Sequence, residues 1–299
     1  MTHPAFLSFD TTGLWVGKFE TGYDGATTTT AAQVNSIDTS KIIIKPNVYS
    51  WRNITVGNAF KNSYDYNRNL DSHMMKNTEW GSVAYLQHSK YGSGTRIRIN
   101  NNSSYITGYA ATEEPTLGSN SGISINGNHI ESTSLGSDGT YTINYLNSKS
   151  VVASTTNNYS GIYDTSGGAW EYVIGYTTGA ATVGGNSYIT SLYHNFFSDN
   201  TYLKYWDKYT STVNTNYNNR ILGDATGEMG SFGREKDPDN NYRNKSSWYK
   251  NLSVYFESSY PWLARSGLWY DGTVSGIFAF NLGDGNVYMY YSFRVVLTP

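Results

Sequence analysis

The sequence predicts an α+β fold with two short helices, many short strands and extensive irregular structure. Three observations predict it. Apolar residues recur at spacings of three and four over only two stretches, 50–69 and 76–86, which is typical of amphipathic helices. Elsewhere, short apolar runs alternate with segments rich in Gly, Asn, Ser and Asp, as strands joined by turns do. No fixed-period repeat or linker divides the chain, so we expect a single domain over residues 1–299.

Both helices are predicted from the residues that would share one face. In the second helix this stripe holds Trp80, Val83 and Ala84, and Asn77 or Thr78 is expected to cap its start. The stripe of the first helix consists of Trp51, Ile54, Val56, Ala59, Phe60 and Tyr64.

The predicted strands are short. Residues 14–20 alternate like an early strand, 41–45 form an apolar run that suits a buried strand, and 288–297 have strong strand propensity. Residues 116–150 and 177–189 are rich in Gly, Ser, Thr and Asn, and we expect loops or hairpins there.

Composition narrows the function classes. The 28 Tyr and 8 Trp are residue types enriched at binding interfaces, although a β-rich core would also use them. The formal net charge is −2 and no run of Lys or Arg exists, so we expect no nucleic-acid partner. No segment approaches the about 18 apolar residues of a membrane span, and residues 1–4 do not begin a signal peptide. We therefore expect no membrane insertion.

The chain contains no cysteine, which excludes disulfides, thiolate metal sites and thiol catalysis. The five histidines form no H-x-x-x-H or H-x-H pair, so a zinc site has no local support. Asp237, Asp239 and Asn241 alternate as calcium ligands do, but Pro238 interrupts them and a solvated turn is favoured. Glu113 and its neighbour Glu114 would point to opposite faces of a strand. We predict no catalytic residue and no cofactor.

Several motifs in a fixed order resemble the formylglycine-generating-enzyme type of C-type lectin fold. The strongest match reads GIYDTSGGAWEY. The matching segments are Gly13–Glu20, Lys45–Trp51, Asn77–Trp80, Gly161–Tyr172, Arg265–Gly267 and Ser292–Val296. The resemblance covers nearly the whole chain and implies the fold. It does not imply the activity, because enzymes of that family use their own cysteines. A structural calcium is a further implication of the resemblance, at a position that the sequence does not give.

The strongest motif also carries a structural expectation of its own. Trp170 and Tyr172 alternate with Glu171, so the two rings are expected to pack inward while the carboxylate points to the other face. Gly167 and Gly168 are expected to allow a tight turn before this strand.

The C-terminal segment 266–291 resembles the variable region of diversity-generating retroelement proteins. Gly, Phe and Asn residues alternate with chemically unrelated neighbours, and in that family errors at template adenines diversify such positions. Trp269 and Met289 cannot arise from the usual Asn codons, which leaves their status open. The predicted ligand-binding residues are Leu268, Trp269, Tyr270, Asp271, Ser275, Ala279, Leu282, Asp284, Val287, Tyr288, Tyr290 and Tyr291.

The expected function is therefore binding of a ligand or receptor through a hypervariable surface, without catalysis. The expected partner is a protein or glycan on a host cell or in the environment. The expected location is a phage tail tip or a bacterial cell surface. Two alternatives remain: a non-thiol enzyme that acts on carbohydrate, and a purely structural virion or surface protein.

Overall fold

The structure is a computed structural model, and it confirms the α+β class. It describes residues 2–7, 13–46, 48–97, 153–177, 189, 191–193, 195–209, 221–226, 228, 247–255, 260–269 and 271–299. Two α-helices lie in these ranges, α1 (Val56–Tyr66) and α2 (Asn77–Gln87). The strands are β1 (Trp15–Val16), β2 (Gly22–Tyr23), β3 (Ile42–Ile43), β4 (His73–Met74), β5 (Trp170–Thr177), β6 (Asp207–Tyr209), β7 (Trp262–Ser266), β8 (Gly276–Gly283), β9 (Tyr291–Phe293) and β10 (Val295–Leu297).

Both predicted helices exist, with shorter or shifted bounds. Thr55 caps α1, because its side-chain oxygen accepts a hydrogen bond from Asn58 N–H at 3.2 Å. The expectation that Asn77 or Thr78 caps α2 is wrong. The cap residue is Lys76, and its N–H is held at 2.8 Å by the carboxylate of Glu79 in the first turn. The Glu79 carboxylate thus accepts a hydrogen bond from the backbone N–H of the residue that precedes the helix.

The predicted strands are present but shorter than their patterns suggest. Only Trp15–Val16 of 14–20 and Ile42–Ile43 of 41–45 pair in sheets. The stretch 288–297 holds two strands, not one, because β9 pairs with β5 whereas β10 pairs with β1 and β4. Arg294 lies at the break, where the chain passes from one sheet to the other.

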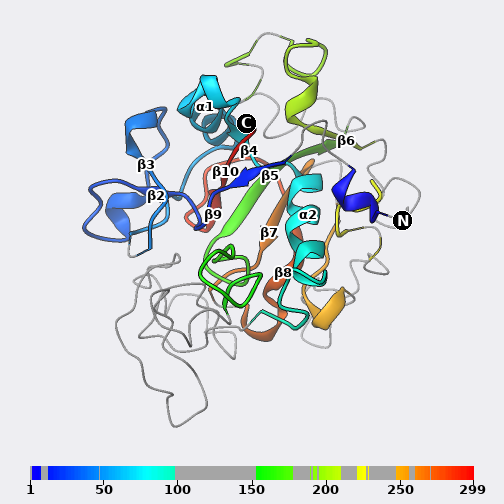
Figure 1. Cartoon of the computed structure of the whole chain (residues 1–299). Helices are drawn as coiled ribbons and strands as arrows, with labels where there is room; N and C mark the ends of the chain where they lie inside the picture. Colours follow the sequence, from blue (N-terminus) through cyan, green and yellow to red (C-terminus); the bar gives the residue numbers. More distant parts are fainter. Residues whose placement is uncertain are drawn as a thin grey trace.

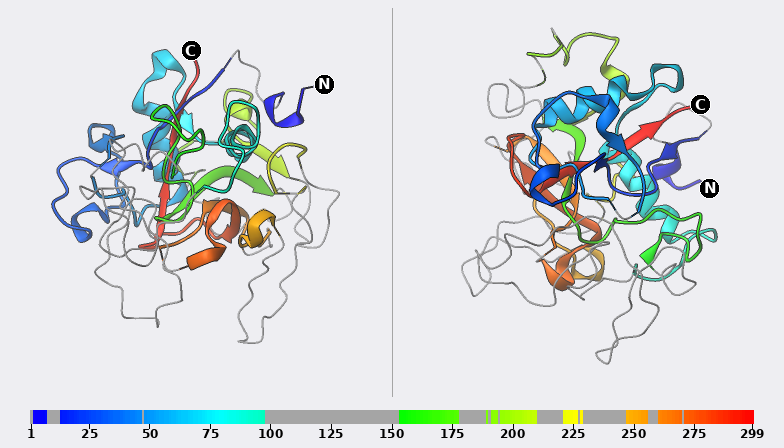
Figure 2. Two further views of the ribbon diagram at one scale, coloured as in Figure 1. Left: turned by 60° about the horizontal axis from the view of Figure 1, so that its bottom comes forward. Right: turned by 90° about the vertical axis from the view of Figure 1, so that its left-hand side faces the viewer.

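Three sheets are formed by the described residues. The largest has the order β6-β5-β7-β8, and β9 pairs in parallel with the start of β5. The second has the order β1-β10-β4, and the third consists of β2 and β3. Figure 1 shows α2 running along the large sheet, and Figure 2 shows β10, in red, beside the blue N-terminal segment that contains β1.

The large sheet is buried on both faces. Trp170, Tyr172 and Ile174 of β5 belong to the apolar cluster that also holds α1 residues. Val173 of β5 belongs instead to the cluster that holds Trp80 and other α2 residues. The two faces of the sheet are therefore covered by different layers, as the alternation of side chains along β5 requires.

Arg294 joins three of the motifs that carried the family resemblance. Its guanidinium pairs with Glu171, Nε to Oε2 at 2.8 Å and Nη2 to Oε1 at 2.5 Å. It also donates to the carbonyl oxygens of Gly17 at 2.6 Å and Tyr163 at 3.1 Å. Trp170 and Tyr172 pack on the opposite face, so the expected alternation with Glu171 is confirmed. The carboxylate of Glu171 can be buried on its own face of β5 because the guanidinium of Arg294 pairs with it.

The turn before β5 also follows the sequence. Gly167 has a φ of 91° and Gly168 a φ of 85°, a left-handed conformation that glycine adopts without strain. The expected loops at 116–150 and 178–188 lie outside the described residues, as do Glu113, Glu114 and the Asp237–Asn241 segment.

Candidate functional site

Five of the twelve predicted binding residues lie in or next to the loop between β8 and β9, residues 284–290. Val287 and Met289 are each 38% exposed. Leu282, Asp284, Tyr288 and Tyr290 are half-buried. We call these six side chains the β8–β9 surface. Five of them were predicted from sequence, and the structure adds Met289.

The backbone of this loop is held from outside by hydrogen bonds to its carbonyl oxygens. Two of the donors, Asn53 N–H and Val56 N–H, come from the entry to α1, and two others come from β5. The acceptors are Gly285 from Val56 N–H (3.1 Å), Asn286 from the Tyr172 hydroxyl (3.2 Å), Tyr288 from Asn53 N–H (3.1 Å), Met289 from the Arg52 guanidinium (2.8 Å) and Tyr290 from Trp170 N–H (2.9 Å).

Arg52 is the buried support beneath this loop. Besides Met289, its guanidinium donates to the carbonyl of Thr29 at 3.3 Å, and it lies 5.6 Å from the centre of the Trp269 ring. Burial lowers the pKa of Arg52 to about 10, although the nearby Glu20 acts in the opposite direction. Arg52 is therefore still charged at neutral pH, and it orders the loop through a charge-assisted hydrogen bond.

Asp284 orders the start of the loop. Its carboxylate accepts hydrogen bonds from Asn286 N–H at 3.0 Å, the Asn286 amide at 2.8 Å and the Tyr288 hydroxyl at 3.0 Å. Gly285 between them has a φ of 84°. This is an Asx-type turn, in which a short acidic side chain takes the place of a backbone acceptor.

Four tyrosines form a stack that leads from the core to the surface. Tyr172 is fully buried and its ring stacks on Tyr291 at 4.2 Å. Tyr291 contacts Tyr290 at 4.9 Å and Tyr288 at 5.9 Å between ring centres. Tyr288 and Tyr290 are nearly parallel, 5.1 Å apart with an angle of 9°. The outer pair is thus positioned by rings that belong to the core.

The local environment favours the neutral phenol at Tyr288. Burial, the hydrogen bond to Asp284 and the charge of Asp284 raise the pKa of Tyr288 to about 12. Tyr260, which is 36% exposed, lies close enough to contribute. Tyr288 therefore stays protonated at physiological pH and donates its proton to Asp284.

The other predicted binding residues are not part of this surface. Tyr270 lies outside the described residues. Six side chains are buried, with exposed fractions of 7% or less: Leu268, Trp269, Asp271, Ser275, Ala279 and Tyr291. Because so little of these six side chains is exposed, they offer little area for direct contact with a ligand, and their role in binding stays a prediction.

These buried residues have structural roles. Asp271 accepts a hydrogen bond from Leu268 N–H at 2.8 Å, and the Ser275 hydroxyl donates to the Leu268 carbonyl at 3.1 Å. Together they close the turn between β7 and β8. Ala279 points into the α1-side layer, and Tyr291 donates to the Leu282 carbonyl at 3.2 Å.

Sequence reasoning missed the residues that hold the loop. Arg52 and Asn53 lie more than 200 positions before it, so no local pattern connects them. A weak signal exists at Asn53, because Asn is one of the residues that tolerate the left-handed φ of 59° found there.

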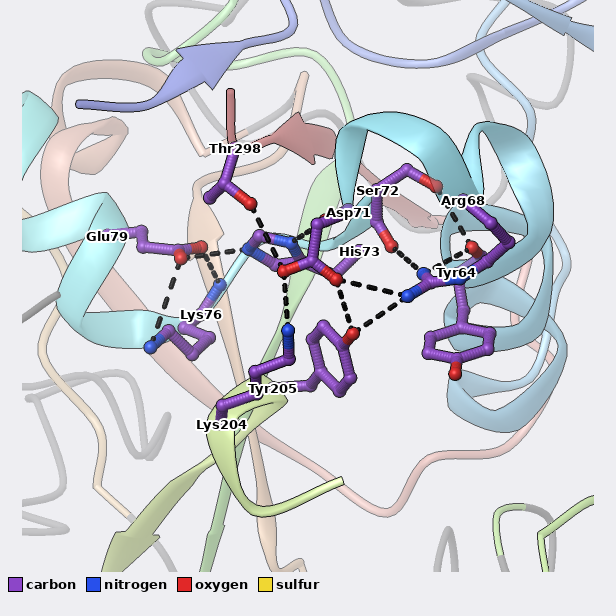
Figure 3. Close-up of polar contacts among 10 residues, drawn as sticks. All are labelled: Tyr64, Arg68, Asp71, Ser72, His73, Lys76, Glu79, Lys204, Tyr205 and Thr298. Atoms are coloured by element: carbon purple, nitrogen blue, oxygen red, sulfur yellow. Dashed lines mark hydrogen bonds and ion pairs between the residues drawn. The ribbon is translucent and has the colours of Figure 1, made fainter. Parts of the chain in front are cut away.

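A second polar cluster surrounds Asp71, in the turn between α1 and β4 (Figure 3). Its carboxylate accepts from four side chains. Burial opposes its charge, but hydrogen bonds from Lys204 and Tyr205 outweigh burial and lower its pKa to about 2. The donors are Arg68 (3.0 Å), Lys204 (2.7 Å), Tyr205 (2.5 Å) and Thr298 (3.2 Å).

His73 in the same cluster is committed to structure. Its Nδ1 lies 2.9 Å from the Asp71 carbonyl, which can only accept, and its Nε2 lies 2.9 Å from the Glu79 carboxylate. Burial alone would lower the pKa of His73, but the charge and hydrogen bond of Glu79 outweigh burial, so the pKa is raised. Both ring nitrogens are engaged by neighbouring oxygen atoms, and neither is free to act as a general base.

The described residues contain no group of three or more His, Asp or Glu side chains placed to hold a metal ion. No helix in the described part of the chain is long and apolar enough to cross a membrane. The histidines at 129 and 194 lie outside these residues.

Neither a protein-family model nor a curated protein sequence matches the chain. The assignment of a function therefore depends on the geometry of the β8–β9 surface.

Proposed function

We propose that this chain is a ligand-binding protein that acts through the β8–β9 surface and performs no catalysis. The observation that carries the proposal is the set of five external hydrogen bonds to the loop carbonyls. Because these bonds use backbone acceptors, they persist whichever side chains the loop carries. A rigid backbone with exchangeable side chains is the arrangement that binding proteins use to present variable contacts.

The fold we propose is the C-type lectin-like fold of the formylglycine-generating-enzyme type, as a single domain over residues 1–299. Its support is the meeting of three family-like segments at Arg294, which contacts Gly17, Tyr163 and Glu171. Sequence segments far apart in the chain thus share one buried ion pair, as parts of one inherited core would.

The diversification of this surface by a retroelement is part of the same proposal. Leu282, Asp284, Val287, Tyr288 and Tyr290 can all be reached from Asn codons by changes at adenines, and each has exposed area. Tyr supplies a large contact area at low entropic cost, as in antibody loops. The partner would be a protein or glycan on a host cell or in the environment, and the chain would lie on a phage tail tip or a bacterial surface.

The gene's surroundings test the diversification. A reverse transcriptase gene and a near-copy of the sequence encoding 266–291, with Asn codons at the variable positions, are expected nearby. If neither element is present, the retroelement part of the proposal fails.

Binding is tested by a composite variant with a matched control. Val287→Ser, Tyr288→Ser and Tyr290→Ser are combined, and retention on immobilised cell-surface proteins and glycans is compared with wild type. The control combines serine at Trp15, Tyr66 and Tyr91, which are exposed elsewhere. We expect the first variant to lose the retained ligand and the control to keep it. Equal retention, or equal loss, would place binding elsewhere.

A further inference from the structure

The β8–β9 surface carries a single charge. Of its six side chains only Asp284 carries a formal charge at neutral pH, because the others are apolar side chains or tyrosines, which are neutral there. The positive charge nearest to the loop backbone, Arg52, is 1% exposed and bonded to Met289 and Thr29 beneath it. Among the described residues, the face presented to a ligand is therefore negative.

The hydrogen-bonding capacity around Asp284 is one-sided. A carboxylate has about four acceptor positions. Three of them are filled by Asn286 N–H, the Asn286 amide and the Tyr288 hydroxyl. These bonds also use the donors that stand next to the carboxylate. The Asp284 carboxylate therefore keeps one open acceptor position. The three hydrogen bonds orient this carboxylate, and its side chain is half-exposed.

The aromatic side chains beside Asp284 add to this preference. The faces of Tyr288 and Tyr290 are electron-rich, and Tyr291 and Tyr172 continue the stack behind them. A cation over such a face gains about 0.5–2 kcal/mol, and a planar guanidinium can stack while its N–H groups reach a carboxylate.

We propose that the β8–β9 surface receives an arginine side chain displayed by a protein partner, stacked on the Tyr288–Tyr290 pair and bonded to Asp284. This inference rests on the proposed function and names its ligand class. Charge complementarity selects the occupant, because arginine supplies five donors and no acceptor. A glycan hydroxyl needs donors as well as acceptors, and those beside Asp284 are already used within the loop.

The experiment measures binding of a capped tetra-arginine peptide to the purified full chain by calorimetry. A tetra-citrulline peptide keeps the shape without the charge, and methyl glycosides represent the glycan alternative. Asp284→Asn is the main variant, with Asp199→Asn as control because Asp199 carries the same charge on a distant exposed turn. Tyr290→Leu removes a ring and leaves the charge.

We expect tetra-arginine to bind wild type and Asp199→Asn equally. We expect Asp284→Asn to weaken binding by about tenfold or more, since charge-assisted hydrogen bonds are the stronger class. Tyr290→Leu should weaken it by about threefold through loss of the cation–π contact. Urea unfolding of each variant confirms that the fold is retained.

Three results would overturn the inference. The first is binding of tetra-citrulline as tight as that of tetra-arginine, the second is equal weakening by the two Asp variants, and the third is the absence of binding by either peptide. If a methyl glycoside binds instead and Asp284→Asn abolishes it, the surface is a binding site of another class. In that case the proposed function stands and only the arginine assignment fails.

Discussion

The β8–β9 loop and the Asp71 cluster are both polar and rich in tyrosine, but they are held in opposite ways. In the loop, backbone carbonyls accept the hydrogen bonds that fix the chain from outside, while Asp284 accepts the side-chain bonds of Asn286 and Tyr288 within it. Around Asp71, the side chains are themselves the bonds, with four donors on one carboxylate. The difference teaches where the chain tolerates substitution. A substitution should change stability little where a backbone carbonyl accepts the hydrogen bond, and much where the replaced side chain is itself the acceptor.

Arg294→Met should lower the free energy of unfolding more than any other change considered, because Arg294 holds its region through side-chain bonds. It leaves Glu171 buried without its partner, which costs about 3–5 kcal/mol. Urea unfolding measures the free energy. Lys208→Met, at an exposed position of β6, is the control and should stay within about 0.5 kcal/mol of wild type. Equal effects of the two changes would remove the central role of Arg294.

Asp71→Asn should follow, with a loss of about 1–2 kcal/mol at pH 7. The folded-state pKa of Asp71 is lowered to about 2. Its contribution is therefore present above the unfolded value of 3.8 and is lost as pH falls through about 2. The difference between variant and wild type should shrink correspondingly in acid. A constant difference from pH 7 to pH 2 would show that ionisation is not involved.

Asp164→Asn should stabilise the chain by about 1 kcal/mol at pH 8. Burial, opposed by Arg294 and increased by Glu171, raises the pKa of Asp164 to about 7. The wild type therefore loses stability as pH rises from the unfolded pKa through 7. Asn keeps an acceptor for Glu20 N–H and tolerates the φ of 63°. A variant less stable than wild type at pH 8 would contradict this.

Val287→Ser and Met289→Ser should have the smallest effects, within about 0.5 kcal/mol each. Both side chains are exposed, and the bond at Met289 uses its carbonyl. Gly285→Ala, two residues before Val287, should cost more, about 1 kcal/mol, because its φ of 84° disfavours a side chain. If the serine variants cost as much as Gly285→Ala, the side chains of the loop also hold it in place.

Much of the fold could be predicted from local patterns. The two helices, the glycine turn at 167–168 and the alternation around Glu171 depend on neighbours in sequence. The lengths of the strands could not be predicted, because β9 and β10 join different sheets and the break at Arg294 is set by that tertiary choice.

The candidate site was predictable only in part. Composition located the segment 266–291, but exposure within it depends on the layers that cover it. Ala279 is fully buried because it lies within β8 in the large sheet, whereas Val287 follows the end of that strand. The supports at Arg52 and Asn53 are set by tertiary contact alone.

Sequencing the stretch of the gene that encodes residues 266–291 across a population tests the central claim most directly. The account predicts substitutions concentrated at positions 282, 284, 287, 288 and 290. It predicts none at Gly285 and none at the support residues Arg52 and Asn53. Identical sequences at the five positions, or variation spread equally over the buried positions 268, 269, 275, 279 and 291, would contradict it.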